Sequence, residues 1–516
     1  MRVVLLRPPR YVWPFNSETS AFWQPLGLLC LAGAVRRELP QVEIHVWDAP
    51  GEKIGWRTLH QRLAERKIDV LGVGEETVSA HEALRAAEMV KQLYPDCLVV
   101  AGGTYFPYAI EDTLQSGYVD VIVRGEGELT FVELLRHIAD PDQWRHIDGL
   151  AYRDENQQTV ITRPRSLIDN LDDLPLPAYD LVKMNLYGRN SRNHPALTSI
   201  EHSRGCIDSC SFCILWKHMG QSVNGNGRFR PCWRTKSPQR SFAEVRRLYR
   251  HYGRRTFGWV DPTFNVSSSW SDAWAELMLK SELLTPRGPQ TIHTAWFRAD
   301  GIVRDEKHGV LEKLVRAGLR QVMIGIERID PDSLAILNKH HNSWEICRQA
   351  CFILRQKYPQ VYTIGTVIFG LPGDTKEDLH RLIDAQYQLG LDYCFIMPLT
   401  PNPGTESAHQ AAQKGYIINE NLNTYNFHTP VCRTAALNLH QLESTYWRLM
   451  LNPSPRRISH AFGKLFCAHD PRKRRVHWAL WRKGASIAFK SLTRALLPSK
   501  NHQPTLYSRR PSWYDK

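Results

Sequence analysis

Three cysteines stand close together near the middle of the chain, in the stretch R-G-C-I-D-S-C-S-F-C. Cys206, Cys210 and Cys213 follow the spacing C-x3-C-x2-C. Cysteine thiolates are soft metal ligands, so three of them on one short loop predict a shared metal centre. A tetrahedral site needs four ligands, and the loop therefore leaves one coordination position for another group. The other eight of the eleven cysteines are scattered, and we expect them to be small buried apolar residues.

Two kinds of metal centre fit this loop. The first is a structural zinc site in which His218 is the fourth ligand. The second is an iron–sulfur cluster in which one iron has no protein ligand. A closed zinc site gives no role to the regular structure predicted around the loop, whereas the bare iron of an open cluster can bind a substrate or cofactor. We therefore favour the cluster and keep a zinc-stabilised binding protein as the alternative.

The loop follows the first strand of a region, residues 196–405, that alternates between short apolar strands and helical patterns. Six such units predict an open or partial (β/α)6 barrel. Active sites of barrels of this kind gather at the C-terminal ends of the strands, which is where the three cysteines stand. The predicted strands are residues 198–202, 257–261, 291–296, 321–326, 363–370 and 392–397.

Residues 1–140 form a second alternating region. The predicted strands are residues 3–6, 42–47, 68–73, 97–103 and 119–123. Buried strands that alternate with helices indicate a parallel sheet covered on both faces, and five of them suit a flavodoxin-like doubly wound domain. A dinucleotide site needs a glycine-rich turn after the first strand, but R-P-P-R-Y follows it here. This region is therefore not expected to bind a dinucleotide.

The rest of the chain differs in composition. Residues 141–195 contain many Pro and Asp residues and are predicted to be a linker. Residues 406–516 are predicted to be mostly helical with a loose tail. Residues 456–516 hold fifteen Lys and Arg and two Asp, which is +13 of the net charge of +14. Within this tail, residues 478–496 predict a basic amphipathic helix that could lie on an anionic membrane or pack on the barrel.

The overall composition narrows the class of protein. With 42% apolar and 23% charged residues, the chain is neither disordered nor collagen-like. No apolar run reaches the roughly 18 residues of a membrane span, and the N-terminus lacks the apolar core of a signal peptide. Scattered cysteines suit a reducing compartment. We expect a cytoplasmic protein whose basic tail could touch a membrane surface, and no nucleic acid partner, because no recognition module stands out.

With the aromatic Phe212 before its last cysteine, the C-x3-C-x2-C loop resembles the radical S-adenosylmethionine (SAM) superfamily. The resemblance implies that Cys206, Cys210 and Cys213 hold three irons of a [4Fe–4S] cluster and that SAM chelates the fourth. One electron from the cluster, delivered by a partner such as flavodoxin or ferredoxin, then cleaves SAM and yields a 5′-deoxyadenosyl radical.

The same resemblance assigns SAM contacts to later strand ends. It implies that Asp261 lies beside the methionyl amine, that Arg298 pairs with the carboxylate and that Glu327 bonds the ribose or the amine. The segment G-T-V-I-F-G-L-P-G-D-T, which contains Gly370, would lie beside the adenine. The order of these residues along the chain, rather than any one of them, supports the assignment.

The first region resembles the cobalamin-binding domain that precedes many radical SAM barrels. The matching pieces are R-P-P, Q-P-L-G-L-L, A-G-G-T and V-R-G-E-G-E-L-T. Gly102 and Gly103 of A-G-G-T would let a flat corrin lie against the strand ends. The cobalt-binding motif D-x-H-x-x-G is missing, so we expect cobalt without a protein imidazole ligand, and we interpret His81 as an ordinary residue at a helix start.

These resemblances imply a cobalamin-dependent radical SAM enzyme. Its expected reaction is methylation of an unactivated carbon in a small or hydrophobic substrate. An alternative is a radical oxidation of a tetrapyrrole, because T-Y-N-F-H-T-P at residues 424–430 and the basic aromatic tail loosely resemble the anaerobic magnesium-protoporphyrin monomethyl ester oxidative cyclases.

Overall fold

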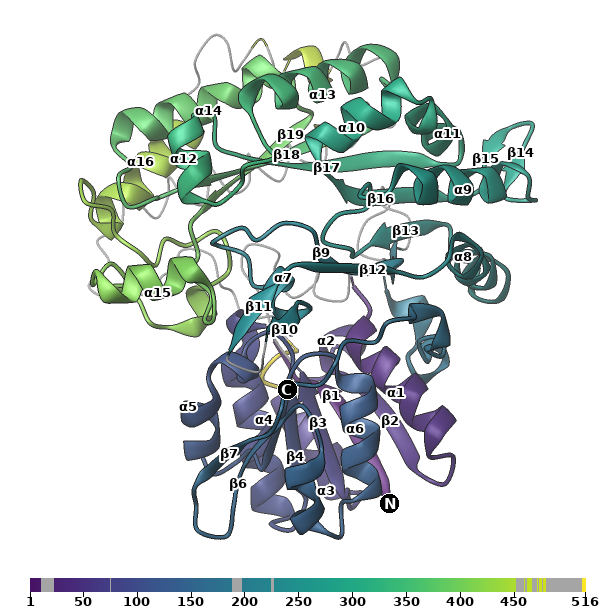
Figure 1. Ribbon diagram of the computed structural model, residues 1–516, viewed down its shortest axis with the longest axis vertical. Coiled ribbons are helices and arrows are strands. Elements are labelled where there is room, and N and C mark those ends of the chain that lie inside the picture. Colours follow the sequence, from purple (N-terminus) through teal and green to yellow (C-terminus); the bar gives the residue numbers. More distant parts are fainter. Residues whose placement is uncertain are drawn as a thin grey trace.

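The computed structural model describes residues 1–10, 23–74, 76–187, 197–223, 227–451 and 513–516, with short pieces between 459 and 478. Two α/β domains are stacked on each other in Figure 1. The N-terminal domain is built on one seven-stranded sheet and the barrel domain on a six-stranded sheet. In the described part of the chain, no helix is long and apolar enough to span a membrane.

The sheet of the N-terminal domain has the order β2-β1-β3-β4-β5-β6-β7. Its first five strands are parallel and follow the flavodoxin-like order 2-1-3-4-5. Alternate residues of β1 face opposite sides, so Val3 and Leu5 enter one core while Val4 and Leu6 enter the other. The strands are β1 (Arg2–Arg7), β2 (Glu43–Asp48), β3 (Val70–Gly74), β4 (Leu98–Gly102), β5 (Val121–Val123), β6 (Leu150–Arg153) and β7 (Thr159–Ile161).

Helices cover both faces of this sheet. On one face lie α1 (Leu26–Glu38) and α6 (Gly127–Arg136), which contact each other; on the other lie α3 (Trp56–Ala64), α4 (Ala80–Leu93) and α5 (Ile110–Gln115). The core under α1 and α6 continues into the barrel domain, because Ile200 and Trp259 belong to the same buried cluster. The two domains therefore share one hydrophobic core.

The predicted linker, residues 141–195, is only partly a linker. Its first part forms β6 and β7, an antiparallel hairpin that pairs with β5 and covers the edge of the parallel sheet. Farther along, Tyr179 and Met184 are buried in the shared core, and the Tyr179 hydroxyl donates to Glu244 Oε1 at 3.0 Å. Short strands and single apolar anchors are hard to predict from a segment rich in Pro and Asp.

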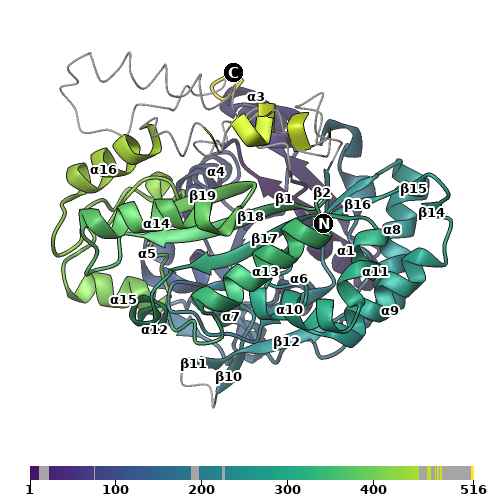
Figure 2. The ribbon, with the colours of Figure 1, turned by 90° about the horizontal axis from the view of Figure 1, so that it is seen from above.

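The barrel domain contains six parallel strands in the order β8-β13-β16-β17-β18-β19. The edge strands β8 and β19 do not pair with each other in the described part of the chain, so the sheet stays open, and helices cover its outer face (Figure 2). The strands are β8 (Leu197–Ile200), β13 (Thr256–Trp259), β16 (Ile292–Phe297), β17 (Leu319–Glu327), β18 (Tyr362–Phe369) and β19 (Tyr393–Pro398). The helices are α8 (Pro238–Tyr252), α9 (Ser268–Leu279), α10 (Ala299–Lys307), α11 (Val310–Arg316), α12 (Pro331–Ile336), α13 (Trp344–Lys357) and α14 (Lys376–Leu389).

Short elements lie between the two sheets (Figure 1). The strand β9 (Ser203–Cys206) pairs with β12 (Cys232–Thr235), and β10 (Gln221–Val223) pairs with β11 (Arg228–Arg230). The one-turn helix α7 (Leu215–His218) follows the cysteines. The three cysteines therefore lie in the layer between the domains.

The C-terminal region adds α15 (Glu406–Gln413) and α16 (Leu439–Leu451) to the barrel domain. The predicted amphipathic helix over residues 478–496 lies outside the described residues, apart from Trp478. The end of the chain is not a loose tail: Trp513 and Tyr514 are buried against the N-terminal domain. The Trp56 N–H donates to the Tyr514 carbonyl oxygen at 3.0 Å, and Figure 2 shows the C-terminus beside α3.

Docking of this tail depends on Gly55, since a Cβ there would lie 1.9 Å from the Trp513 carbonyl oxygen. The backbone of Gly55 is extended, so alanine fits without strain apart from this clash. We predict that Gly55→Ala releases residues 513–516 and speeds hydrogen exchange at the Trp56 amide by about tenfold or more. Gly373→Ala, where a Cβ meets no atom within 4 Å, is the matched control. Unchanged exchange in Gly55→Ala would contradict the docking.

Candidate functional site

The cysteine loop, residues 206–213, leaves β9 at the C-terminal end of the barrel strands. The thiols of Cys206, Cys210 and Cys213 are free and partly buried. The Trp216 indole N–H and the Cys213 amide both donate to the Cys210 carbonyl oxygen, at 3.0 and 3.1 Å, and so fix the turn. Burial raises the pKa of all three thiols, that of Cys210 to about 12. The thiolates that bind metal therefore need a cationic centre to stabilise them.

The segment after α12 holds this loop from the barrel side. Asn338 Nδ2 donates to the Ser209 carbonyl oxygen at 2.7 Å and to Ser209 Oγ at 2.9 Å. The Ser211 amide donates to the Leu337 carbonyl oxygen at 3.0 Å. Asn338 has a φ of 50°, a conformation that asparagine tolerates better than most residues. These contacts place the loop before any ligand binds.

Asp208, inside the loop, is held by Arg298 and His341. Arg298 Nη1 lies 2.9 and 3.0 Å from the two carboxylate oxygens, and His341 Nδ1 lies 3.0 Å from Oδ1. Burial alone would raise the pKa of Asp208, but His341 and Arg298 bring it below its ordinary value. Arg298 also pairs with Asp300. The structure thus brings the predicted Arg298 to the cysteine loop, where its described partners are carboxylates of the chain itself.

Glu327 ends β17 and lies behind the loop in a buried ion pair. Its Oε1 accepts from Lys339 Nζ at 3.1 Å and from Thr366 Oγ1 at 3.2 Å. Lys339 also lies close enough to Cys210 to lower the pKa of that thiol against the larger effect of burial. The φ of Glu327 is 63°, which is unfavourable for this residue type and is typical of functional sites.

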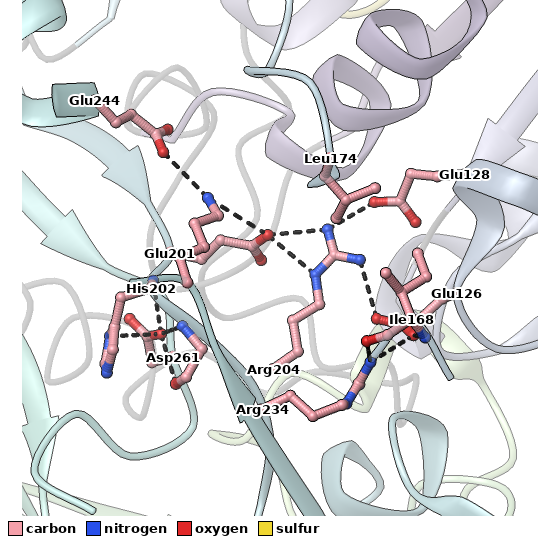
Figure 3. A network of polar contacts seen from close by, with 12 residues as sticks. Glu126, Glu128, Ile168, Leu174, Glu201, His202, Arg204, Arg234, Glu244 and Asp261 are labelled. Atoms are coloured by element: carbon pink, nitrogen blue, oxygen red, sulfur yellow. Dashed lines mark hydrogen bonds and ion pairs between the residues drawn. The ribbon is translucent and has the colours of Figure 1, made fainter. Parts of the chain in front are cut away.

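Asp261 and Gly370 position backbone in this structure. Asp261 follows β13, and its Oδ1 accepts from the amides of His202 and Ser203 and lies 2.9 Å from His202 Nδ1 (Figure 3). It thereby fixes the step from β8 to β9. Gly370 has a φ of 82°, and its amide donates to Asp374 Oδ2 at 2.7 Å in the turn after β18.

A cavity of about 580 Å³ lies between the domains, which we call the large cavity. Its floor consists of glycines at the C-terminal ends of strands of the N-terminal domain: Gly74, Gly102, Gly103, Gly125 and Gly127. Its opposite wall includes Glu201 and Val260, which follow strands of the barrel domain. The carboxyl ends of two parallel sheets thus face each other across one space.

The glycine floor fits a broad, flat group. A Cβ at Gly125 or Gly27 would meet no other atom within 4 Å, so the backbone there borders open space. The apolar side chains of Trp23, Leu28 and Met219 complete the lining. A lining with several glycines and with apolar side chains suits a corrin ring, as the motif A-G-G-T predicts.

A buried ion network joins the large cavity to the cysteine loop (Figure 3). Arg204, two residues before Cys206, contacts Glu126 Oε1 at 3.0 Å, Glu128 Oε1 at 2.6 Å and Glu201 Oε1 at 2.9 Å. Arg234 Nη1 lies 2.8 Å from the other oxygen of Glu126. Glu126 and Glu128 are the glutamates of G-E-G-E. This motif of the N-terminal domain therefore binds Arg204 of β9, the strand that ends at Cys206.

The site does not take the form of the zinc alternative. Within the described ranges, no three Cys, His, Asp or Glu side chains converge as one metal ion requires. His218 instead lines the large cavity, where its Nδ1 is buried without a hydrogen-bond partner and burial lowers its pKa to about 4. A four-iron cluster binds each thiolate to a different iron and needs no fourth protein ligand.

Sequence models of two families match the regions that build this site. The Radical SAM superfamily matches residues 200–385, which include the cysteine loop. The B12 binding domain matches residues 14–135, which include the glycine floor. The chain combines a radical SAM domain with a B12-binding domain. A [4Fe–4S] cluster with SAM and a cobalamin are the cofactors of this radical SAM enzyme.

Known proteins resemble the radical SAM enzyme over most of its length. An uncharacterised methyltransferase of Pyrococcus horikoshii is 26% identical over 84% of this chain and 88% of its own. The anaerobic magnesium-protoporphyrin IX monomethyl ester cyclase of Cereibacter sphaeroides is 25% identical over 86% of this chain and 68% of its own. The structure of the radical SAM methyltransferase TsrM from Kitasatospora setae, with cobalamin and a [4Fe–4S] cluster bound, has a TM-score of 0.68 at 18% identity and covers 94% of this chain and 99% of its own.

The supporting residues of the radical SAM site were not predicted from the sequence. Asn338, Lys339 and His341 stand in L-N-K-H-H, a polar run after α12 whose only signal was its position behind a strand-end glutamate. Arg204 precedes the cysteines in the sequence, but nothing near it in the chain indicates its partners. Its partners Glu126 and Glu128 lie more than seventy residues earlier in the chain.

We predict that Arg204→Met destabilises the protein, because it leaves three carboxylates buried without their shared cation. The free energy of unfolding, measured by urea denaturation, should fall by about 3–5 kcal/mol. Arg246→Met, which removes an exposed pair with Glu282, is the matched control and should cost about 0.5 kcal/mol or less. Equal losses in the two variants would contradict the role given to the network.

Proposed function

We propose that this enzyme methylates an unactivated carbon of a small or hydrophobic substrate that lies between the glycine floor and the cysteine loop. When bound, the cluster and SAM supply a radical that removes a hydrogen atom, and cobalamin supplies the methyl group. The observation that carries the proposal is the large cavity, whose two walls are the carboxyl ends of a cobalamin-binding sheet and of a radical SAM sheet. One substrate can therefore face both cofactors.

Residues of the chain take the following roles in this proposal. Cys206, Cys210 and Cys213 hold the cluster. Arg298 and Glu327, which follow neighbouring strands beside the cysteine loop, receive SAM, with the Arg298 guanidinium free to exchange Asp208 or Asp300 for the methionyl carboxylate. Asp261 and Gly370 position the strand ends around it.

Cobalamin would lie on Gly102 and Gly103 of the glycine floor. Among the described residues that line the large cavity, the only histidine is His218, which comes from α7 and not from the floor. The floor itself therefore offers no imidazole to the lower face of the corrin.

A second candidate is a radical oxidation like that of the tetrapyrrole cyclases, which is favoured by the 25% identity with the Cereibacter sphaeroides cyclase over most of the chain. The relative from Pyrococcus horikoshii is named a methyltransferase and aligns with more of its own length. Methyl transfer is therefore the first choice.

We predict that Cys210→Ala assembles no [4Fe–4S] cluster, because one of the three irons loses its thiolate. After anaerobic reconstitution, iron and sulfide should fall to background and 5′-deoxyadenosine should not form. Binding of hydroxocobalamin should persist, since the glycine floor is untouched. Cys232→Ala, opposite Cys206 in the β9–β12 ribbon, is the control and should keep its full iron content. Loss of iron in the control would identify Cys232 as a fourth ligand.

The reaction itself is tested with SAM that carries a deuterated methyl group. Incubated with the reduced enzyme and an extract of small molecules, it should yield a product that contains the labelled methyl group. Mass spectrometry detects this product. An unlabelled product that has lost hydrogen or gained oxygen would contradict methyl transfer and support the cyclase-like oxidation.

A further inference from the structure

A second cavity of about 180 Å³ lies beside the large one, and we call it the small cavity. It is enclosed by α7, by the β10–β11 pair and by residues 164–167. Gly125, Glu126 and His218 line both cavities, so the two spaces adjoin at these residues. None of the roles assigned above to cluster, SAM or corrin uses the small cavity.

The small cavity carries two positive charges without a carboxylate partner. Arg124 Nη1 donates to the Thr162 carbonyl oxygen at 3.0 Å, and Lys217 Nζ donates to the Gly404 carbonyl oxygen at 2.8 Å. Within the described ranges neither side chain forms an ion pair, although Glu406 partly offsets the lowering of the Lys217 pKa by burial. Lys217 Nζ also lies 5.7 Å from the centroid of the Tyr108 ring. Partly buried cations without a carboxylate partner can still accept an anion.

The other charged groups of the small cavity are already neutralised. Glu126 pairs with Arg204 and Arg234, and Arg165 pairs with Glu133. The lining therefore has a net positive charge that comes from Arg124 and Lys217. This charge attracts an anion and repels a cation such as SAM.

Two polar atoms of the small cavity are buried without a hydrogen-bond partner. These are Ser222 Oγ and His218 Nδ1. Buried polar atoms are nearly always satisfied in native proteins, so these two atoms are available to a ligand that enters the small cavity. A hydroxyl group and a neutral imidazole can each donate a hydrogen bond to a ligand oxygen.

We propose that the small cavity is an anion subsite for a carboxylate or phosphate group. Arg124 and Lys217 supply the charge, and Ser222 and His218 supply further donors. The rest of that ligand occupies the adjoining large cavity. Two sources offer this chemistry: an acid group of the substrate, and the nucleotide phosphate of cobalamin. The assignment to a substrate rests on the proposed function, whereas the anion subsite does not.

The test uses inorganic phosphate and the full-length protein without cofactors. Isothermal titration at constant ionic strength should show saturable binding of phosphate. The double variant Arg124→Gln/Lys217→Gln should bind at least tenfold more weakly, because both charges are removed. Arg163→Gln, which removes an exposed arginine paired with Asp148, is the matched control and should bind as the wild type does. No saturable binding by the wild type, or equal binding by the double variant, would overturn the proposal.

A second variant covers the case in which the double variant does not fold. Ser222→Ala removes one hydroxyl from the cavity wall and should weaken phosphate binding several-fold without a change in melting temperature. Unaltered affinity in Ser222→Ala together with an unfolded double variant would also overturn the proposal.

The source of the anion follows from titrations after loading with hydroxocobalamin or with cobinamide, which lacks the nucleotide. If cobalamin blocks phosphate binding and cobinamide does not, the subsite is assigned to the nucleotide phosphate of cobalamin. Binding that survives both assigns it to the substrate. Blocking by both would place phosphate in the corrin's own space and overturn a separate subsite. These titrations measure binding without turnover. A negative result would overturn the anion subsite without affecting the proposed methyl transfer, and a negative result in the methyl-transfer assay would not affect the anion subsite.

Discussion

The structure depends on one buried guanidinium group. Arg204 lies where the two domains meet, and its partners Glu126, Glu128 and Glu201 come from the turn after β5, from α6 and from the end of β8. A buried charge is tolerated only when such partners surround it with good geometry. Moving either domain would separate this cation from its carboxylates, so the network fixes how the two sheets face each other.

This constraint has a functional consequence because Arg204 precedes the first cysteine by two residues. The same side chain that fixes the domains also fixes the start of the cysteine loop, while Asn338 holds the middle of the loop and Arg298 holds Asp208 within it. The network thereby fixes the cysteine loop relative to the glycine floor, with Arg204 itself lining the large cavity. Two cofactors that must act on one substrate need a fixed separation of this kind.

Much of this site could be predicted where its signal is local. The spacing of the three cysteines, the alternation of strands and helices, and the strand-end positions of Arg298 and Glu327 all lie within short windows of sequence. The remainder depends on contacts between distant segments. Arg204 meets Glu126 across 78 positions, and Asn338 meets Ser209 across 129. For Asp261 and Gly370 the position at a strand end could be predicted but the role could not. The sequence of a polar residue or glycine at a strand end is the same whether the residue contacts a ligand or holds backbone.

The hairpin inside the predicted linker and the docked end of the chain were not predicted for a related reason. The strands β6 and β7 are only four and three residues long, and residues 513–516 owe their order to a surface around Gly55 that the tail sequence does not reveal. In both cases the partner surface, rather than local propensity, decides the structure.

We infer that one chain holds cobalt in the large cavity and iron at the cysteine loop, which follows Arg204 of the cavity's barrel-side wall. Anomalous diffraction from crystals of the fully loaded enzyme, recorded at the iron and cobalt absorption edges, tests it most directly. The account predicts an iron peak bound by Cys206, Cys210 and Cys213 and a cobalt peak inside the large cavity above Gly102 and Gly103. A zinc signal at the cysteines, or cobalt outside this cavity, would contradict it.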